Sequence, residues 1–419
     1  MDNSVKEAVV TLGKKAKIAE YTLMTAGTNT KNSALESIAS ALEKNTSYII
    51  EKNKADIEAA KANGMADSMI DRLSLDEKRI SDIAQAVRKI ISLDDPVGKV
   101  LSGGKRPNGL MIEKVTVPLG VVAVIFEARP NVTADAAALC MKSGNAVILR
   151  GGKEAFHSNK AIVDTMRTAV EKAGLPADCI QLVENTTRES ANELMRLNDY
   201  VDVLIPRGGA GLIKACVQNA TVPVIETGTG NCHVYVDEFA DIDKAVQIIY
   251  NAKVSRPSVC NACESIVVHR AVAKEALPKI KAKLDEANVI IHSDSEAAAI
   301  ISDTVAATEE DFGKEYLGYE ISIKVVGSID EAIAHITKYS TGHSETIVTE
   351  NYHNSKKFTA CIDSAAVYVN ASTRFTDGGE FGFGAEIGIS TQKLHARGPL
   401  GLPELTTFKY IICGDGQIR

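Results

Sequence analysis

The stretch Gly120-Val-Val-Ala-Val-Ile-Phe-Glu-Ala-Arg-Pro-Asn131 decides the fold of this 419-residue chain. Its apolar and largely β-branched run, 121–126, predicts a buried strand, and the polar residues that follow predict a loop at the strand end. The same pattern then repeats, with helices expected over 133–143, 159–173, 189–197 and 212–219 and strands over 146–149, 180–183, 201–205 and 222–225. Short strands alternating with amphipathic helices predict an α/β fold with a doubly wound parallel sheet.

Glycines, cations and carboxylates follow these strands. Because ligands of such sheets bind at the carboxyl ends of the strands, we expect an anionic, phosphate-bearing ligand there. The segment 206–211 could present helix N-terminal amides to a phosphate, or could be a tight turn that needs glycine. The segment 150–153 could supply a cation for a ribose 2′-phosphate, or could be a solvated basic turn. The residues in question are Arg150, Lys153, Arg207, Gly208, Gly209 and Glu226.

The flanking regions extend this pattern. Residues 1–93 read as helices, 105–109 as a turn-rich break and 111–117 as a half-exposed strand. After residue 231, alternating helices and strands predict a second α/β domain, and 375–388 is rich in glycine. The last predicted strand, 406–413, could pair with 111–117 or with another subunit.

Composition narrows the functional classes. Hydrophobic residues make up 45% of the chain and charged residues 24%, as in ordinary globular proteins. The net charge of −7 argues against a nucleic-acid partner. No apolar run approaches the length needed to span a bilayer, and the first 17 residues lack the apolar core of a signal peptide. Eight scattered cysteines favour reduced thiols and a cytoplasmic location.

A second stretch, Val254-Ser-Arg-Pro-Ser-Val-Cys-Asn-Ala-Cys-Glu264, carries the candidate nucleophile, Cys260. Ser255, Pro257 and Ser258 suggest that a helix begins here, and a helix N-terminus together with Arg256 would favour thiolate. Cys260 could instead be a small buried residue. With Cys263 it could form a redox pair, but zinc would need two more ligands than this motif offers, so no metal site is expected.

Two other side chains have two interpretations each. Asn131, at the end of the first parallel strand, could donate to a tetrahedral oxyanion or cap the following helix. Glu226 could be a general base or a solvated carboxylate.

Taken together, these residues resemble the aldehyde dehydrogenase superfamily over almost the whole chain. The stretches that carry the resemblance include Val222-Pro-Val-Ile-Glu-Thr-Gly-Thr-Gly-Asn-Cys-His233 and Asn251-Ala-Lys-Val-Ser-Arg-Pro-Ser-Val-Cys-Asn-Ala262. The segments 118–132, 204–209 and 370–398 match as well. More narrowly, the chain resembles the branch that acts on L-glutamyl 5-phosphate in proline biosynthesis.

The resemblance implies a cofactor-binding domain (1–104 and 119–229), a catalytic domain (230–398) and a small β oligomerisation element (105–118 and 399–419). It implies NADPH/NADP as the cofactor, and a homo-oligomer, either dimer or tetramer, with glutamate 5-kinase as a possible functional partner. Cys260 becomes the nucleophile, Asn131 the oxyanion donor and Glu315 a candidate contact for the cofactor ribose. Candidates for binding the substrate's anionic groups are Arg129, Arg256, Arg374, His395 and Arg397.

The sequence departs from the superfamily pattern in two places. Glu226 is followed by Thr-Gly-Thr where Leu-Gly-Gly is general, which questions whether it activates water. Cys263 stands where an ordinary apolar residue would serve. A hydrolytic NAD(P)-dependent aldehyde dehydrogenase and a non-catalytic nucleotide-binding scaffold are the alternative functions.

Overall fold

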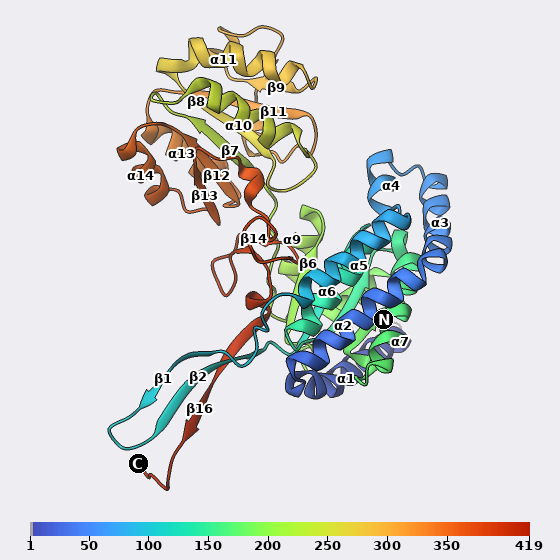
Figure 1. Cartoon of the computed structure of the whole chain (residues 1–419). Helices are drawn as coiled ribbons and strands as arrows, with labels where there is room; N and C mark the ends of the chain where they lie inside the picture. Colours follow the sequence, from blue (N-terminus) through green and yellow to red (C-terminus); the bar gives the residue numbers. More distant parts are fainter. Residues whose placement is uncertain (1–2) are drawn as a thin grey trace. The chain divides into compact units, whose positions relative to one another are not determined.

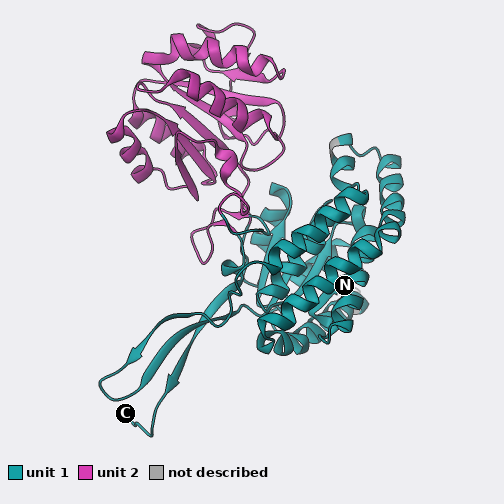
Figure 2. Cartoon of the chain, viewed as in Figure 1, with its two compact units in different colours: residues 1–226, 382–388, 400–419 teal, residues 227–381, 389–399 magenta. Residues whose placement is uncertain are grey.

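The computed structural model describes residues 3–419, which divide into two compact units (Figure 2). Unit 1 consists of residues 1–226, 382–388 and 400–419, and unit 2 of residues 227–381 and 389–399. The functional boundaries expected from the resemblance stay predictions. No helix within 3–419 is long and apolar enough to cross a membrane.

Unit 1 is built on a four-stranded parallel sheet in the order β5-β4-β3-β6. Figure 1 labels β6 of this sheet and several of the helices of the unit. Its strands are β3 (Val121–Phe126), β4 (Ala146–Gly151), β5 (Ile180–Leu182) and β6 (Val203–Arg207). The helices between them are α6 (Pro130–Lys142), α7 (Phe156–Lys172), α8 (Arg188–Met195) and α9 (Ala210–Asn219). The strand order reverses between β3 and β6, and such a switch point is where doubly wound sheets bind ligands. The predicted fold class is confirmed.

Helices precede the sheet, as the apolar periodicity predicts: α1 (Asn3–Thr25), α2 (Thr28–Lys44), α3 (Thr46–Ala62), α4 (Asp67–Leu73) and α5 (Glu77–Ile91). The fifth strand expected at 222–225 is wrong, because only a single bridge joins Leu204 to Val224. Pro223 has no backbone N–H to donate to a ladder, so pairing does not extend along this segment.

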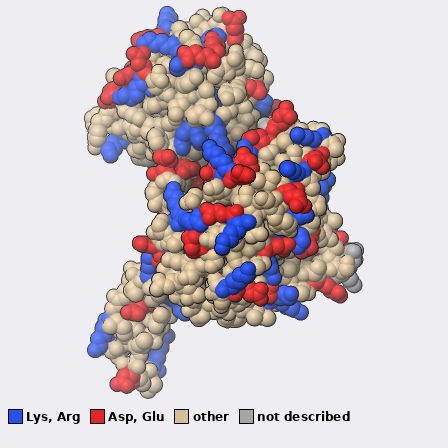
Figure 3. Space-filling view, turned by 45° about the vertical axis from the view of Figure 1, so that its right-hand side comes forward, with Lys and Arg blue, Asp and Glu red and all other residues tan. Residues whose placement is uncertain are grey.

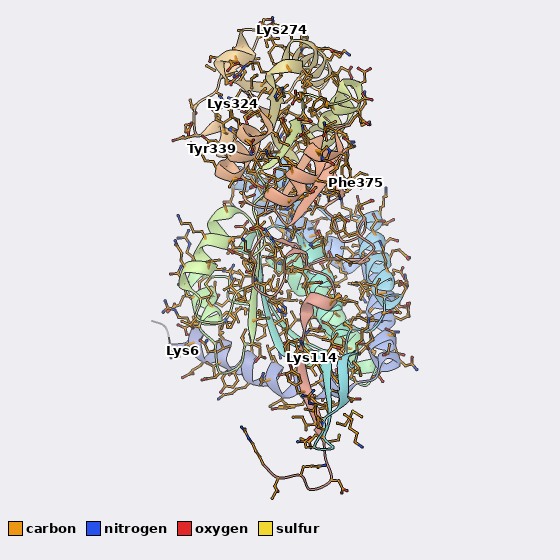
Figure 4. The ribbon with its side chains drawn as sticks, turned by 90° about the vertical axis from the view of Figure 1, so that its left-hand side faces the viewer. Lys6, Lys114, Lys274, Lys324, Tyr339 and Phe375 are labelled. Carbon is orange, nitrogen blue, oxygen red and sulfur yellow. The ribbon has the colours of Figure 1, made fainter. Side chains whose placement is uncertain are left out.

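A separate three-stranded antiparallel sheet also belongs to unit 1. It has the order β1-β2-β16, with β1 (Val100–Lys105), β2 (Met111–Pro118) and β16 (Thr406–Cys413). The terminal strand therefore pairs with the 111–117 strand, one of the two expected arrangements. β1 was not predicted, because its Ser-Gly-Gly reads as a turn. Lys114 of β2, labelled in Figure 4, stacks on the Phe408 ring with 3.6 Å between Nζ and the centroid.

Unit 2 contains a seven-stranded parallel sheet in the order β10-β9-β11-β8-β7-β12-β13. Its strands are β7 (Cys232–Val236), β8 (Cys263–His269), β9 (Ile290–Ser293), β10 (Val305–Ala306), β11 (Glu320–Val326), β12 (Ser344–Val348) and β13 (Ala366–Val369). The helices are α10 (Ile242–Val254), α11 (Arg270–Asp285), α12 (Ser295–Ala298), α13 (Ile329–Tyr339) and α14 (Tyr352–Cys361), and a short ladder pairs β14 (Ile389–Ser390) with β15 (Gly398–Pro399).

Helices cover both faces of the unit 2 sheet. Ile266 and Val268 of β8 join the core against α10 and α11, whereas Val267 between them joins the core against α13 and α14. A parallel sheet buried on both faces needs such continuous apolar strands. Strand β7, which was not predicted from the sequence, is likewise apolar on both faces. It pairs with β8, the strand that follows the Cys260 loop.

Candidate active site

Cys260 lies in the loop that joins the end of α10 to the start of β8. No helix begins at this loop, so the predicted support from a helix N-terminus is wrong. The physical reason is that the apolar residues after Cys260 pair as a strand with β7 and β11. For this half-buried residue, side chains rather than a helix dipole are therefore the groups that could activate the thiol.

His343 supplies the group that sequence reasoning missed. Its Nε2 lies 3.2 Å from Cys260 Sγ, within hydrogen-bonding distance, and its side chain belongs to a fully buried residue. The two residues meet because His343 immediately precedes β12 and Cys260 precedes β8, and both strands flank β7. Parallel strands bring their amino ends to one edge. A search for Cys and His at strand starts in the second domain could have found this pair.

A chain of hydroxyl groups orients the His343 ring. Nδ1 lies 2.8 Å from Ser344 Oγ, which is 2.6 Å from Thr376 Oγ1. The Tyr368 hydroxyl is 2.7 Å from the same Thr376 oxygen. An imidazolium at His343 can therefore donate from Nδ1 to Ser344 and from Nε2 to a thiolate. With Nδ1–H donated to Ser344, Nε2 is placed to accept a hydrogen bond from the Cys260 thiol.

Gly230 brings a second chain segment against Cys260, the candidate nucleophile. A Cβ at this position would lie 1.5 Å from the Cys260 carbonyl oxygen, so only glycine fits. The Gly230 N–H donates to Glu315 Oε1 at 2.7 Å. Glu315 thus holds the backbone beside Cys260, and its expected contact with a cofactor ribose stays a prediction.

The neighbouring cysteines do not share the setting of Cys260. Cys263 begins β8, faces the core against α10 and α11, and donates to the Ser265 carbonyl at 3.3 Å. Burial raises the pKa of its thiol to about 12. Cys260 lies in a loop and Cys263 begins a strand, so no helical turn brings the two thiols together, and the redox pair considered from the sequence stays a prediction. The thiol of Cys232 instead donates to the Cys260 carbonyl at 3.2 Å.

The cationic candidates of unit 2 separate into two groups. Arg374 donates from Nε to Ser255 Oγ at 3.1 Å and from Nη1 to Asn261 Oδ1, so it touches the Cys260 loop. Arg256 belongs to that loop and is exposed. Arg397 instead forms an ion pair with Asp363 at 2.7 Å, and His395 is exposed with a positive φ of 68°.

In unit 1, the predicted phosphate-binding edge lies at the ends of β3, β4 and β6. The Gly209 N–H already donates to Glu127 Oε2 at 2.8 Å. The Arg150 guanidinium donates to the carbonyls of Thr186 and Thr187 at 2.6 and 2.9 Å. Much of the expected donor set thus holds the protein's own loops in place.

Other donors at this edge have no partner within the described chain. They are the buried Nε atoms of Arg150 and Arg207 and the exposed ammonium of Lys153. A set of cationic donors at a switch point fits the phosphates of a dinucleotide. On the face shown in Figure 3, basic and acidic side chains are otherwise interspersed.

Asn131 lies in the first turn of α6. The N-cap of that helix is Arg129, and Pro130 is its first residue, so the capping role considered for Asn131 is wrong. The side chain is exposed, and its Nδ2 donates to Asp135 Oδ2 at 2.9 Å. Burial raises the pKa of Asp135 to about 6, and the Asn131 hydrogen bond opposes that rise. One N–H of the amide remains for an external acceptor.

The sequence profile of the aldehyde dehydrogenase family matches residues 4–308. The chain belongs to the aldehyde dehydrogenase family. Gamma-glutamyl phosphate reductase of Clostridium perfringens (strain SM101 / Type A) is 62% identical over 407 residues, covering 97% of this chain and 98% of the relative. The crystal structure of gamma-glutamyl phosphate reductase from Thermotoga maritima superposes with a TM-score of 0.96 at 50% identity, covering 98% and 99% of the two chains.

A more distant structure shares the fold alone. An acetylating aldehyde dehydrogenase from Geobacillus thermoglucosidasius gives a TM-score of 0.71 at 18% identity, covering 100% of this chain and 99% of that one. Membership of the family confirms the resemblance seen in the sequence. It makes the chain an oxidoreductase that uses a nicotinamide cofactor.

Proposed function

We propose that this chain reduces L-glutamyl 5-phosphate to L-glutamate 5-semialdehyde and phosphate with NADPH, the second step of proline biosynthesis from glutamate. The observation that carries the chemistry is the 3.2 Å approach of His343 Nε2 to Cys260 Sγ. The high identity to gamma-glutamyl phosphate reductases supports the substrate. Unpaired cysteines support a cytoplasmic location.

In the proposed reaction, His343 accepts the Cys260 proton and the thiolate attacks the acyl carbon. The bond from that carbon to the phosphate oxygen breaks, the proton passes to the departing phosphate, and a thioester remains on Sγ. NADPH, when bound, supplies the hydride that reduces the thioester carbon. Collapse of the adduct releases the semialdehyde and returns the thiolate, which His343 stabilises after it takes a solvent proton.

The cofactor would be held by the donors of unit 1 that have no partner in the described chain, which are Nε of Arg150, Nε of Arg207 and the ammonium of Lys153. Lys153 is the candidate for the 2′-phosphate that distinguishes NADPH from NADH. Asn131 as the oxyanion donor, Glu226 near the cofactor and Arg129 as an anion contact stay part of the proposal. Asn131→Ala is expected to lower turnover by about 100-fold, the cost of one lost oxyanion donor.

The proposal includes self-association through the sheet β1-β2-β16. Val100, Leu101, Tyr410 and Ile412 are each more than half exposed on it. A long apolar sheet edge left in water would promote association with other chains, so coverage by a second copy is the physical expectation. Light scattering should give a dimer or tetramer, and Ile412→Lys should shift it toward monomer.

The test is turnover in the oxidative direction, with glutamate 5-semialdehyde and NADP, in the presence and absence of phosphate. We expect NADPH formation to require phosphate and to vanish in Cys260→Ala, while Cys361→Ala, an exposed thiol on α14, stays active. Phosphate-independent release of free glutamate would instead favour the hydrolytic alternative. Absence of any aldehyde-dependent turnover would favour a scaffold.

A further inference from the structure

The substrate of the proposed reaction carries its phosphoryl group on the oxygen bonded to the carbon that Cys260 attacks. A phosphate site must therefore adjoin the Cys260 loop, which is a requirement that rests on the proposed function. Phosphate at neutral pH carries up to two negative charges, and a planar guanidinium is well matched to its oxygens.

Most cations of unit 2 are already neutralised by carboxylates. Lys253 is paired with Glu264, for example, and Lys393 and Arg397 are paired with Asp363. Near the nucleophile, by contrast, Arg256 and Arg374 have no carboxylate within 4 Å in the described part of the chain. Two guanidinium groups without a carboxylate partner, one half-buried and one exposed, provide local positive charge that an anion can neutralise.

The position of Arg374 is fixed relative to the nucleophile. Its segment, η4 (Thr373–Phe375), is joined to Asn261, the residue directly after Cys260. Asn261 Nδ2 donates to the carbonyls of Arg374 and Thr376 at 3.2 and 2.9 Å, and Thr373 Oγ1 donates to the Asn261 carbonyl at 2.7 Å. Phe375, labelled in Figure 4, is the next residue and is exposed. The guanidinium is thus preorganised before a ligand arrives.

The hydrogen bonds of Arg374 also leave donors available. Nε binds Ser255 Oγ and one Nη1 proton binds Asn261 Oδ1, while Nη2 has no partner within 3–419. Burial and the positive charge of Arg256 both lower the pKa of Arg374, although it stays a cation at neutral pH. Asp377 and Cys260 oppose that shift. A bound anion would relieve the repulsion between the two arginines.

We propose that Arg374 and Arg256 form the phosphate subsite: Arg374 grips the phosphoryl oxygens of the acyl phosphate, and Arg256 supplies the second positive charge. The α-carboxylate of the substrate is the other possible ligand. The phosphate is favoured because it lies directly beside the attacked carbon, whereas three carbons separate the α-carboxylate from that carbon. The same subsite receives inorganic phosphate in the oxidative direction.

The experiment measures KM for phosphate and KM for glutamate 5-semialdehyde separately, in Arg374→Gln, Arg374→Lys and Arg256→Gln. Losing a charge-assisted contact should raise the phosphate KM about 10- to 100-fold in Arg374→Gln, and less for the exposed Arg256. The semialdehyde KM should change less than about threefold. Arg374→Lys should recover only part of the loss, because lysine keeps the charge but not the planar fork.

Arg270→Gln is the matched control, since it removes a surface arginine that pairs with Glu296 on the outside of unit 2. Arg256→Gln guards against misfolding, because its side chain has no structural partner in the described residues. A second measurement needs no turnover: inorganic phosphate should protect Cys260 of the wild type from iodoacetamide, and both Gln variants should need about 10-fold more phosphate.

Unchanged phosphate KM and unchanged protection in both Gln variants would overturn the subsite. A rise in the semialdehyde KM alone would also overturn it, by assigning the pair to the α-carboxylate. A wild type without phosphate-dependent turnover would refute the proposed function instead, and the protection measurement would then decide on the subsite by itself.

Discussion

Replacing His343 by glutamine should lower the reactivity of the Cys260 thiol at neutral pH but not at alkaline pH. At 3.2 Å, a thiolate–imidazolium pair has a gross attraction of about 5 kcal/mol at an effective dielectric constant of about 20. Desolvation of the buried imidazole offsets part of it. Forming the ion pair also costs the roughly two pK units that separate an ordinary thiol from an ordinary imidazole. About half of that attraction therefore keeps roughly a third of a paired thiol ionised at neutral pH, and the full attraction keeps nearly all of it ionised, whereas an ordinary thiol is only about 3% thiolate at pH 7.

The assay is alkylation by iodoacetamide, with the Cys260 peptide quantified by mass spectrometry because Cys361 and Cys413 are exposed as well. We expect a 10- to 30-fold lower rate in His343→Gln at pH 7, since the reagent reacts with thiolate alone. The difference should vanish above about pH 9.5, where an unassisted thiol is ionised. The Cys361 peptide serves as an internal reference.

His353→Gln, an exposed histidine on α14, is the matched control and should behave as the wild type. A rate ratio that stays constant from pH 6 to pH 10 would refute proton transfer to His343. It would mean that the substitution had merely changed access to the thiol.

Three further predictions follow from the structure. Lys153→Ala should weaken NADPH about 10-fold or more and NADH hardly at all, and equal losses in titrations with both cofactors would dismiss it as the 2′-phosphate contact. Glu226→Gln should lower phosphate-dependent turnover by much less than about 100-fold, because phosphate needs no base, and a 1,000-fold loss in a folded variant would restore the hydrolytic alternative. Lys253→Met should lower the free energy of unfolding by about 3 to 5 kcal/mol, since it strands the fully buried Glu264. Burial already raises the pKa of Glu264 to about 7, so this loss should be smaller at pH 6, where a proton neutralises the carboxyl, than at pH 8; urea unfolding with equal losses at both pH values would contradict that role.

The sequence was most informative where burial imposes a pattern. The run 121–126 is buried at every residue, and its neighbours follow the expected alternation, so the first sheet could be predicted from apolar periodicity. Residues 222–225 are also apolar, yet they form no strand, because the proline among them prevents further pairing. β1 could not be predicted, since a Ser-Gly-Gly strand is defined by its partner rather than by its own side chains.

The candidate site was predicted less completely for a similar reason. Cys260 could be chosen from its local stretch, but the helix inferred beside it was wrong. His343 lies 83 residues away in sequence, and only the strand order β8-β7-β12 brings it to the thiol. The sequence offered Arg374 as one of five candidates for anion binding but could not rank them. Ranking them requires knowing which of the cations are paired with carboxylates in the structure.

The way the chain passes between its units has a consequence for synthesis on the ribosome. β2 pairs with β16, and their partners Pro118 and Thr406 are 288 residues apart. At about 5 to 20 residues per second, this edge of β2 waits roughly 15 to 60 s for its partner, while all of unit 2 is being made. During that time a nascent chain exposes one unpaired edge of β2, which is a site for aggregation or for a chaperone. A ribosome stalled before residue 406 would therefore hold a protein whose Cys260 loop is already made and whose β2 edge is still open.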